Sequence, residues 1–149
     1  MSRAMVDIDV EQRFSAPIDE VFAAVTDHKR LESWQPSTKV TMEKEGVPAP
    51  NGLRAVRRIK QGSLNIREEV VRWEQPIAMD YRPVKGPPLR DHLGEIRLSP
   101  IVKGGTTVRY RIRFGMPWWA GGDLTARLVA NRLKTVIAAA YRRLADELR

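Results

Sequence analysis

The stretch at residues 108–114, VRYRIRF, decides the fold, because its apolar and basic residues alternate strictly. Such alternation predicts a strand with one buried and one solvated face. After GMPWWAGG at 115–122, a helical pattern runs from residue 122 or 123 to about residue 147, with several alanines on its apolar face. A sheet and one long helix that meet through small residues are expected to leave a hollow core, which is typical of a small-molecule pocket.

Further strands are predicted where short apolar runs stand between turn residues. These runs cover residues 6–14, 38–45, 53–60, 64–73, 77–84, 90–98 and 106–114. Two short helices are expected after the first run, over residues 17–26 and 27–34, and Pro36 would end the second. Because short connections favour antiparallel neighbours, the sequence predicts an α+β fold of about seven antiparallel strands and a long C-terminal helix.

Composition excludes several kinds of protein and site. The 149 residues, 42% hydrophobic and 30% charged, fit a single globular domain over residues 1–149. The chain has no cysteine and only two histidines, His28 and His92, so we expect no metal and no cofactor. No apolar run approaches the roughly 18 residues of a membrane span, and no secretory signal is evident, so a cytoplasmic location is expected.

The formal net charge of +8 raises nucleic acid and anionic membranes as partners. The basic residues alternate with apolar ones, however, as outward strand positions do. The expected basic outer face includes Arg97, Arg109, Arg111 and Arg113. Tyr110 and Phe114 point to the opposite face, so the arginines lack aromatic neighbours for base stacking. Nucleic acid is therefore not expected as a partner, whereas transient contact with an anionic membrane remains open.

His92 is the first candidate for chemistry in the interior. It shares its strand parity with Gly94, Ile96 and Leu98, which places the imidazole on the cavity side. There it could orient a ligand carbonyl or transfer a proton near neutral pH. The alternative is a structural histidine that makes one hydrogen bond at the start of a strand.

Glu68 is the second candidate, because it shares its parity with Ile66 and Val70. An inward carboxylate could hydrogen-bond a ligand or act as a base, and Arg72, on the same face, is a potential ion-pair partner. The alternative is an edge or salt-bridged residue. A bulge in this strand would reverse the assignment, because Trp73 has the opposite parity.

The remaining candidates for the pocket are mostly aromatic or apolar. Each tyrosine offers an aromatic wall and a polar tip, although core packing alone would also explain it. Gln12 is either a pocket group or a residue near the end of the sheet, and Trp34 is expected at the narrow end. The expected ligand-binding set is Gln12, Trp34, Val70, Tyr81, His92, Tyr110, Phe114, Trp118, Trp119, Val129, Leu133, Ile137 and Tyr141.

Adjacent indoles at Trp118 and Trp119 are the sharpest local feature of the chain. They could gate the mouth of the pocket or enter a membrane interface beside the basic surface. The alternative packs one indole under the helix and leaves the other partly exposed. Leu124 and Leu128 are out of phase with the apolar stripe, so they pack under this loop or meet a partner.

Several short sequence words match a known family. They are FSAPIDEVF at 14–22, TD at 26–27 before Trp34 and Pro36, EEV at 68–70 before Pro76 and Tyr81, and GTTV at 105–108. With the order of elements, they make the chain resemble the START-like superfamily, in particular its polyketide cyclase/dehydrase and lipid-transport branch, over nearly its whole length. The resemblance implies a helix-grip fold, in which a curved sheet surrounds the terminal helix and leaves a cavity for hydrophobic ligands.

Three functions follow as hypotheses. The first is binding of a small hydrophobic or aromatic molecule, lipid- or polyketide-like, between the sheet and the helix. The second is a cyclase/dehydrase-type enzyme that uses His92 and Glu68 for proton transfer. The third is a membrane- or protein-interaction module that uses Trp118, Trp119 and the basic face. A monomer and a homodimer are both compatible with the sequence.

Overall fold

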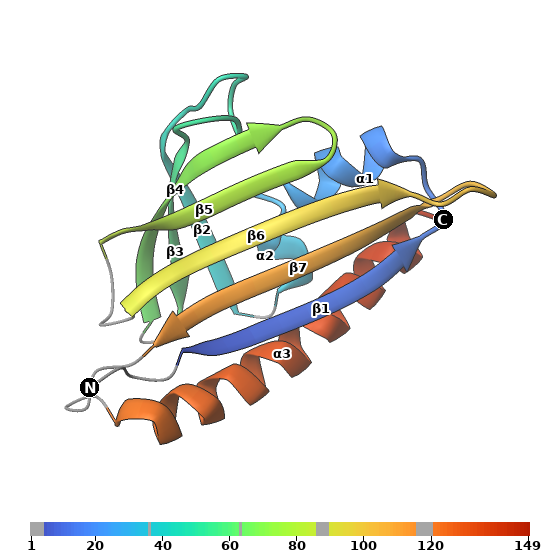
Figure 1. Ribbon diagram of the computed structural model, residues 1–149. Helices are drawn as coiled ribbons and strands as arrows, with labels where there is room; N and C mark the ends of the chain where they lie inside the picture. Colours follow the sequence, from blue (N-terminus) through green and yellow to red (C-terminus); the bar gives the residue numbers. More distant parts are fainter. Residues whose placement is uncertain (1–4, 36, 63, 86–89, 116–120) are drawn as a thin grey trace.

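The computed structural model describes residues 5–35, 37–62, 64–85, 90–115 and 121–149 (Figure 1). Within these residues, seven strands form one antiparallel sheet in the order β1-β7-β6-β5-β4-β3-β2. The elements in chain order are β1 (Val6–Phe14), α1 (Ile18–Val25), α2 (Leu31–Trp34), β2 (Thr38–Lys44), β3 (Val56–Gln61), β4 (Leu64–Glu74), β5 (Ala78–Lys85), β6 (Arg90–Pro100), β7 (Thr106–Gly115) and α3 (Gly122–Glu147).

This architecture confirms the predicted helix-grip fold, and the main differences from the predicted ranges lie at two elements. The second short helix is a single turn, because hydrogen bonds between residues three apart make a tight turn ahead of Leu31. The third strand begins at Val56 rather than at residue 53, because Leu53 forms a local bridge with Val47 in the preceding loop. Both differences arise from local hydrogen bonding that hydrophobic periodicity does not report.

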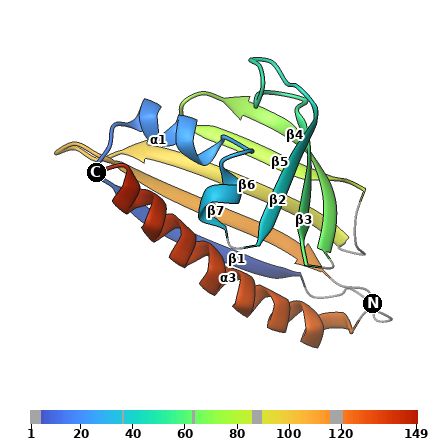
Figure 2. The same cartoon turned by 180° about the vertical axis from the view of Figure 1, so that it is seen from behind.

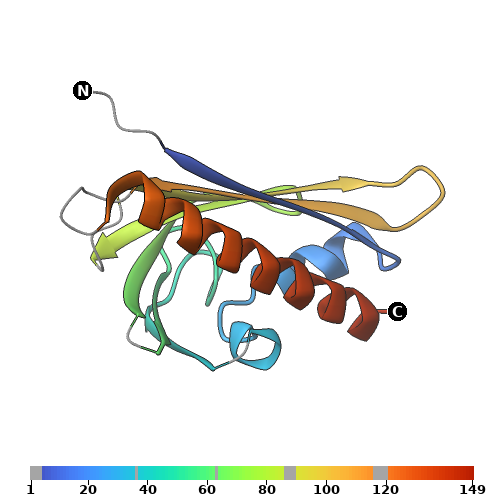
Figure 3. The same ribbon diagram turned by 90° about the horizontal axis from the view of Figure 1, so that it is seen from below.

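Irregular pairing curves the sheet. The register between β4 and β5 shifts twice, between Arg67 and Glu68 and between Val70 and Arg72. Such bulges bend a strand and increase its twist. Figures 2 and 3 show β2, β3 and β4 turning away from the plane of β1 and β7, so that the sheet wraps around one side of α3.

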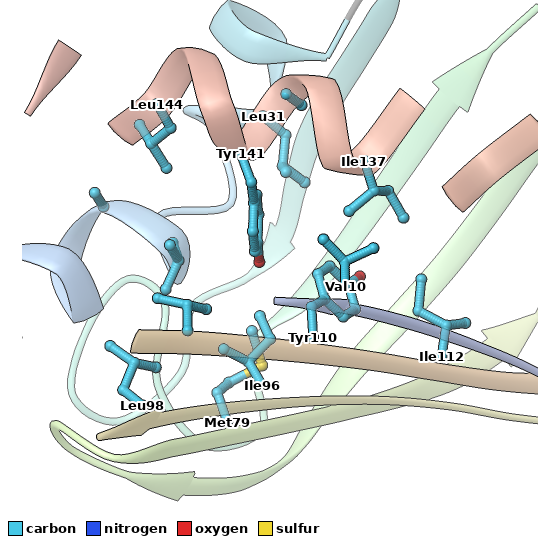
Figure 4. Close-up of a cluster of buried hydrophobic side chains, with 14 of the residues drawn as sticks. Val10, Leu31, Met79, Ile96, Leu98, Tyr110, Ile112, Ile137, Tyr141 and Leu144 are labelled. Atoms are coloured by element: carbon cyan, nitrogen blue, oxygen red, sulfur yellow. The ribbon is translucent and has the colours of Figure 1, made fainter. Parts of the chain in front are cut away.

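The long helix α3 lies along β1. Small side chains, Ala126, Ala130 and Ala140, are buried on its inner face, which lets the helix approach the sheet closely. Towards its C-terminal end, Tyr141 and Leu144 are fully buried and complete the hydrophobic core (Figure 4). The alanine-bearing face predicted from the sequence is therefore the face that packs.

Candidate functional site

A cavity of about 670 Å³ lies between α3 and the concave face of the sheet. Its volume falls within the range of about 300–1,000 Å³ that is usual for small-molecule pockets. Ser37, Gly62 and Arg132 are among its lining residues and are exposed, so the cavity opens to solvent at this side. Its apolar wall is formed by Val25, Leu31, Ile59, Ile66, Ile96, Ile112, Phe114, Val129, Leu133, Val136 and Ile137.

The cavity also has a buried polar wall, to which five strands and α3 each contribute one side chain. These side chains are Arg57, Glu68, Tyr81, His92, Tyr110 and Tyr141. Buried polar groups are costly unless they satisfy one another. Their mutual contacts therefore determine what the wall offers a ligand.

An ion pair between Arg57 and Glu68 forms the centre of this wall. Nε and Nη2 of Arg57 donate to Oε1 of Glu68 at 3.1 and 2.9 Å, and the two residues face each other in the β3–β4 register. Both are almost inaccessible, with 5% and 3% of their surface exposed. Burial is the largest single influence on the pKa of Arg57 and lowers it, but Glu68, Tyr81 and Tyr110 together raise it above its ordinary value. The guanidinium therefore stays charged inside the protein.

His28 extends the network away from the cavity. Nη1 of Arg57 donates to Nδ1 of His28 at 2.9 Å, and Nε2 of His28 then donates to the backbone oxygen of Asn51 at 3.1 Å. This pattern requires the neutral tautomer with its proton on Nε2. Burial, reinforced by the charge of Arg57, lowers the pKa of His28 from 6.5 to about 3. His28 thus links the β2–β3 loop to the polar wall as a neutral group.

His92 lies at the other end of the network. Its Nε2 is 3.8 Å from Oε2 of Glu68, and its buried Nδ1 has no hydrogen-bond partner among the residues that the structure describes. Burial lowers the pKa of His92; Glu68 opposes this effect and Arg57 adds to it. The imidazole is therefore uncharged at neutral pH and lies within reach of a carboxylate.

Three tyrosines complete the polar wall. The hydroxyls of Tyr81 and Tyr110 are hydrogen-bonded to each other, and the Arg57 guanidinium lies 4.6 Å from the centre of the Tyr81 ring. Burial raises the pKa of Tyr110 to about 12 and raises those of Tyr81 and Tyr141 as well. All three hydroxyls therefore keep their protons at physiological pH.

Gly94 positions Tyr81. The two residues pair across β5 and β6, and a Cβ atom at Gly94 would collide with the Tyr81 ring. The ring can therefore lie flat against the sheet only because residue 94 has no side chain. This placement leaves the cavity open and directs the hydroxyl towards Tyr110.

The structure brings most of the predicted pocket residues together. Residues of the predicted set that line the cavity are Tyr81, His92, Tyr110, Phe114, Val129, Leu133, Ile137 and Tyr141, and Glu68 joins them. Val129 is 39% exposed and stands at the mouth. Trp118, Trp119 and the side chain of Trp34 lie outside the part of the chain that the structure describes.

Gln12 and Val70 are not placed at the cavity. Gln12 lies near the end of β1, in a separate surface groove beside Arg142 and Asp146. The side-chain amide of Gln12 donates to the backbone oxygen of Arg13. Val70 is buried in the hydrophobic core, where its backbone bonds to Ala55. Both share the inward parity of pocket residues, but parity does not tell how far along a strand the cavity extends.

The expected pairing of Glu68 with Arg72 is wrong. The bulge after Val70 turns Arg72 outward, where it bonds to Glu74, and turns Trp73 inward onto Phe22. The true partner, Arg57, was missed. The hairpin pairs Gln61 with Leu64, which places residue 57 opposite residue 68; a two-residue turn at Gln61-Gly62, as the sequence suggests, would have placed it opposite residue 66.

The outer face of the sheet is less basic than its arginines suggest. Arg109 and Arg113 pair with Asp9 and Asp7 of β1, and Arg97 pairs with Asp80 and Glu95. Among the described residues, no group of three histidine, aspartate or glutamate side chains is placed to hold a metal ion. No helix in the same residues has the length and apolar character needed to cross a bilayer.

Comparisons with known proteins agree with this architecture. A START superfamily protein from Mycobacterium smegmatis is 14% identical, with a TM-score of 0.77, over 97% of this chain and 99% of that one. A protein from Thermobifida fusca is 20% identical, with a TM-score of 0.75, over 95% and 92% of the two chains. The Aha1 dimer from Colwellia psychrerythraea is 14% identical, with a TM-score of 0.69, over 96% of each chain. These likenesses establish the fold.

The sequence itself identifies the family. No curated protein matches the chain. The family described as polyketide cyclase / dehydrase and lipid transport matches residues 5–149, which is nearly the full length. The chain therefore belongs to the polyketide cyclase/dehydrase and lipid transport family.

Proposed function

We propose that this protein, as a single domain over residues 1–149, binds a small hydrophobic or aromatic molecule, lipid- or polyketide-like, in the cavity under α3. The observation that carries the proposal is a cavity of about 670 Å³ with an apolar wall, a buried polar wall and an opening to solvent. Such a cavity suits a guest molecule that is apolar over most of its surface.

Apolar burial would supply most of the affinity, at about 25 cal/mol for each Å² removed from water. The polar wall would set orientation, because a ligand oxygen near the hydroxyls of Tyr81 and Tyr110 could exchange hydrogen bonds with them. The Arg57–Glu68 pair is held by its own hydrogen bonds and does not depend on a ligand for a partner. Little reorganisation would therefore be needed when the ligand enters.

A fluorescent aromatic alcohol, 2-naphthol, is a suitable probe, with binding followed by its emission. Leu133 is half-buried and lines the cavity, whereas Leu128, on the same helix, is 62% exposed. Leu133→Trp should fill the space and abolish binding, and the matched variant Leu128→Trp should bind like the wild type. Equal binding by the two variants, or none by the wild type, would contradict the proposal.

A second candidate function is proton transfer on a polyketide-like substrate, as in a cyclase/dehydrase. It is favoured by the neutral His92 imidazole, whose Nε2 lies 3.8 Å from Oε2 of Glu68 inside the cavity. The test is conversion of a linear poly-β-ketone thioester by the wild type and by His92→Gln. Turnover that the variant retains in full would remove this candidate.

Other expectations from the sequence remain predictions. They are a cytoplasmic location, a monomeric or homodimeric state, and a gating or membrane role for Trp118 and Trp119. Native mass spectrometry of protein purified from its own host would report the oligomeric state and any small molecule that accompanies the chain.

A further inference from the structure

Two leucines on the first half of α3 face solvent. Leu124 is 70% exposed and Leu128 is 62% exposed. They stand four residues apart, and so lie on one side of the helix, one turn above the other. That side is opposite to Ala126 and Ala130, which pack on the sheet. An exposed apolar pair at this spacing adds nothing to the core and is available to a partner.

Basic side chains flank this pair on both sides. Arg127 and Lys134 lie seven residues apart along one flank, and Arg132 lies along the other, one turn beyond Leu128. All three are exposed, and none forms an ion pair with a carboxylate of the described residues. From residue 124 to residue 145 the helix carries no aspartate or glutamate.

The pair also lies beside the mouth of the cavity. Arg132 lines the cavity and is exposed, and Val129, next to Leu128, stands 39% exposed at the same rim. A surface that receives Leu124 and Leu128 would therefore lie against the opening. A ligand could then enter or leave the cavity without crossing water.

We propose that the first half of α3 docks on an anionic lipid surface, with Leu124 and Leu128 in the interface and Arg127, Arg132 and Lys134 among the headgroups. Apolar side chains between cations are what an interfacial helix presents to a membrane. Each cation near an anionic surface strengthens binding by about fivefold. Nucleic acid fits this surface less well, because its apolar residues are aliphatic and offer no aromatic faces for stacking.

The test is co-sedimentation of the whole protein with two kinds of vesicle, phosphatidylcholine alone and phosphatidylcholine mixed with phosphatidylglycerol. The wild type should bind the mixed vesicles and should be released by salt. The double variant Leu124→Ser/Leu128→Ser should bind at least about tenfold more weakly. Arg127→Gln and Arg132→Gln should each weaken binding by about fivefold.

Val102→Ser and Arg111→Gln are the matched controls. Val102 is fully exposed at the turn between β6 and β7, and Arg111 is exposed on the outer face of the sheet. Both should bind vesicles like the wild type. No binding by the wild type, or binding that survives Leu124→Ser/Leu128→Ser, would overturn the proposal, as would loss of a dimer in that variant without loss of vesicle binding.

The membrane proposal can fail independently of the cavity proposal. Leu133→Trp should lose 2-naphthol and keep vesicle binding, because residue 133 is half-buried and lies outside the exposed apolar pair. Leu124→Ser/Leu128→Ser should lose vesicle binding and keep 2-naphthol. A single variant that lost both properties would contradict this separation of the two surfaces.

Discussion

The space between α3 and the sheet differs at its two ends: one end is a packed core and the other is a cavity. At the C-terminal end of the helix, Leu144 is fully buried and points towards Leu98 on the sheet (Figure 4). At the N-terminal end, Leu133 is only half-buried and Val129 is 39% exposed, and the cavity replaces a packed core. One helix on one sheet therefore makes a solid core at one end and a hollow at the other.

The difference between the two ends is the kind of side chain that the strands supply. The closed end receives apolar residues, such as Met79, Leu98 and Val108, which belong to the hydrophobic core. The open end receives Arg57, Glu68 and His92, which contact one another. Buried polar groups that are bonded to one another, as Arg57 and Glu68 are, need not be covered by apolar side chains. We infer from this comparison that the ion pair and hydrogen bonds within the polar wall keep the cavity open.

Breaking the Arg57–Glu68 pair should have the largest effect at the open end. Arg57→Ala leaves a buried carboxylate without its partner and should lower the free energy of unfolding by about 3–5 kcal/mol. Arg58→Ala, the adjacent residue, breaks only a surface pair with Glu43 and should cost less than about 1 kcal/mol. Urea denaturation measures both. Equal losses would show that the buried pair does not hold the wall.

The closed end can be tested with the same substitution at two positions of α3. Leu144→Ala should lower the free energy of unfolding by about 3 kcal/mol, because it opens a void in a packed core. Leu133→Ala only enlarges an existing cavity and should cost about 1 kcal/mol or less. If denaturation midpoints shifted equally for the two variants, the distinction between the ends would fail.

The buried neutral His28 predicts how stability depends on pH. Its pKa is about 3 in the folded protein and 6.5 as the ordinary value, so the unfolded chain takes up the proton first as pH falls. Stability should be independent of this group above pH 6.5 and decline between pH 6.5 and about 3, by up to about 1.4 kcal/mol per pH unit. His92, whose pKa is also lowered, acts in the same direction.

His28→Asn is the control for this pH dependence. Removing the imidazole removes one of the groups that must gain a proton on unfolding. The free energy of unfolding, measured by denaturation at several pH values between 6.5 and 3, should therefore decrease less steeply with falling pH for His28→Asn than for the wild type. If the free energy of unfolding depended on pH equally in the two proteins, His28 would not be the group responsible for the predicted pH dependence.

The smallest effect is expected at Gly94. Gly94→Ala should push the Tyr81 ring away from the sheet and into the cavity, at a cost of about 1–2 kcal/mol, and should weaken 2-naphthol binding. Tyr81→Leu combined with Gly94→Ala removes the collision, so the two substitutions should cost less together than the sum of each alone. Strict additivity would exclude contact between these positions as the cause.

The fold could be predicted because its signals are local. Alternation in residues 108–114 and the apolar stripe of the terminal helix specify which faces are buried. Parity also placed Glu68, His92 and Tyr110 on the inner face. The opposite parity of Trp73 indicated that a bulge was possible in this strand, but the pattern did not say where in the strand the extra residue lies.

The part of the site that sequence reasoning missed depends on contacts between distant elements. Arg57 was missed because the register of its hairpin depends on the position of the turn: a shift of the two-residue turn by one position changes the residue opposite Arg57 from 68 to 66. His28 could not be found, because its partner Asn51 lies in an irregular loop that returns to the turn between α1 and α2. No local pattern encodes such a contact, so only the folded chain reveals it.

The central claim is that the open end of the space under α3 holds a guest and the closed end does not. Methyl-labelled protein titrated with 2-naphthol tests it directly, through nuclear Overhauser contacts between the probe and individual methyl groups. We predict contacts to Leu133, Ile137 and Ile112, and none to Leu144 or Leu98. Contacts at Leu144, or contacts confined to the exposed Leu124 and Leu128, would contradict the account.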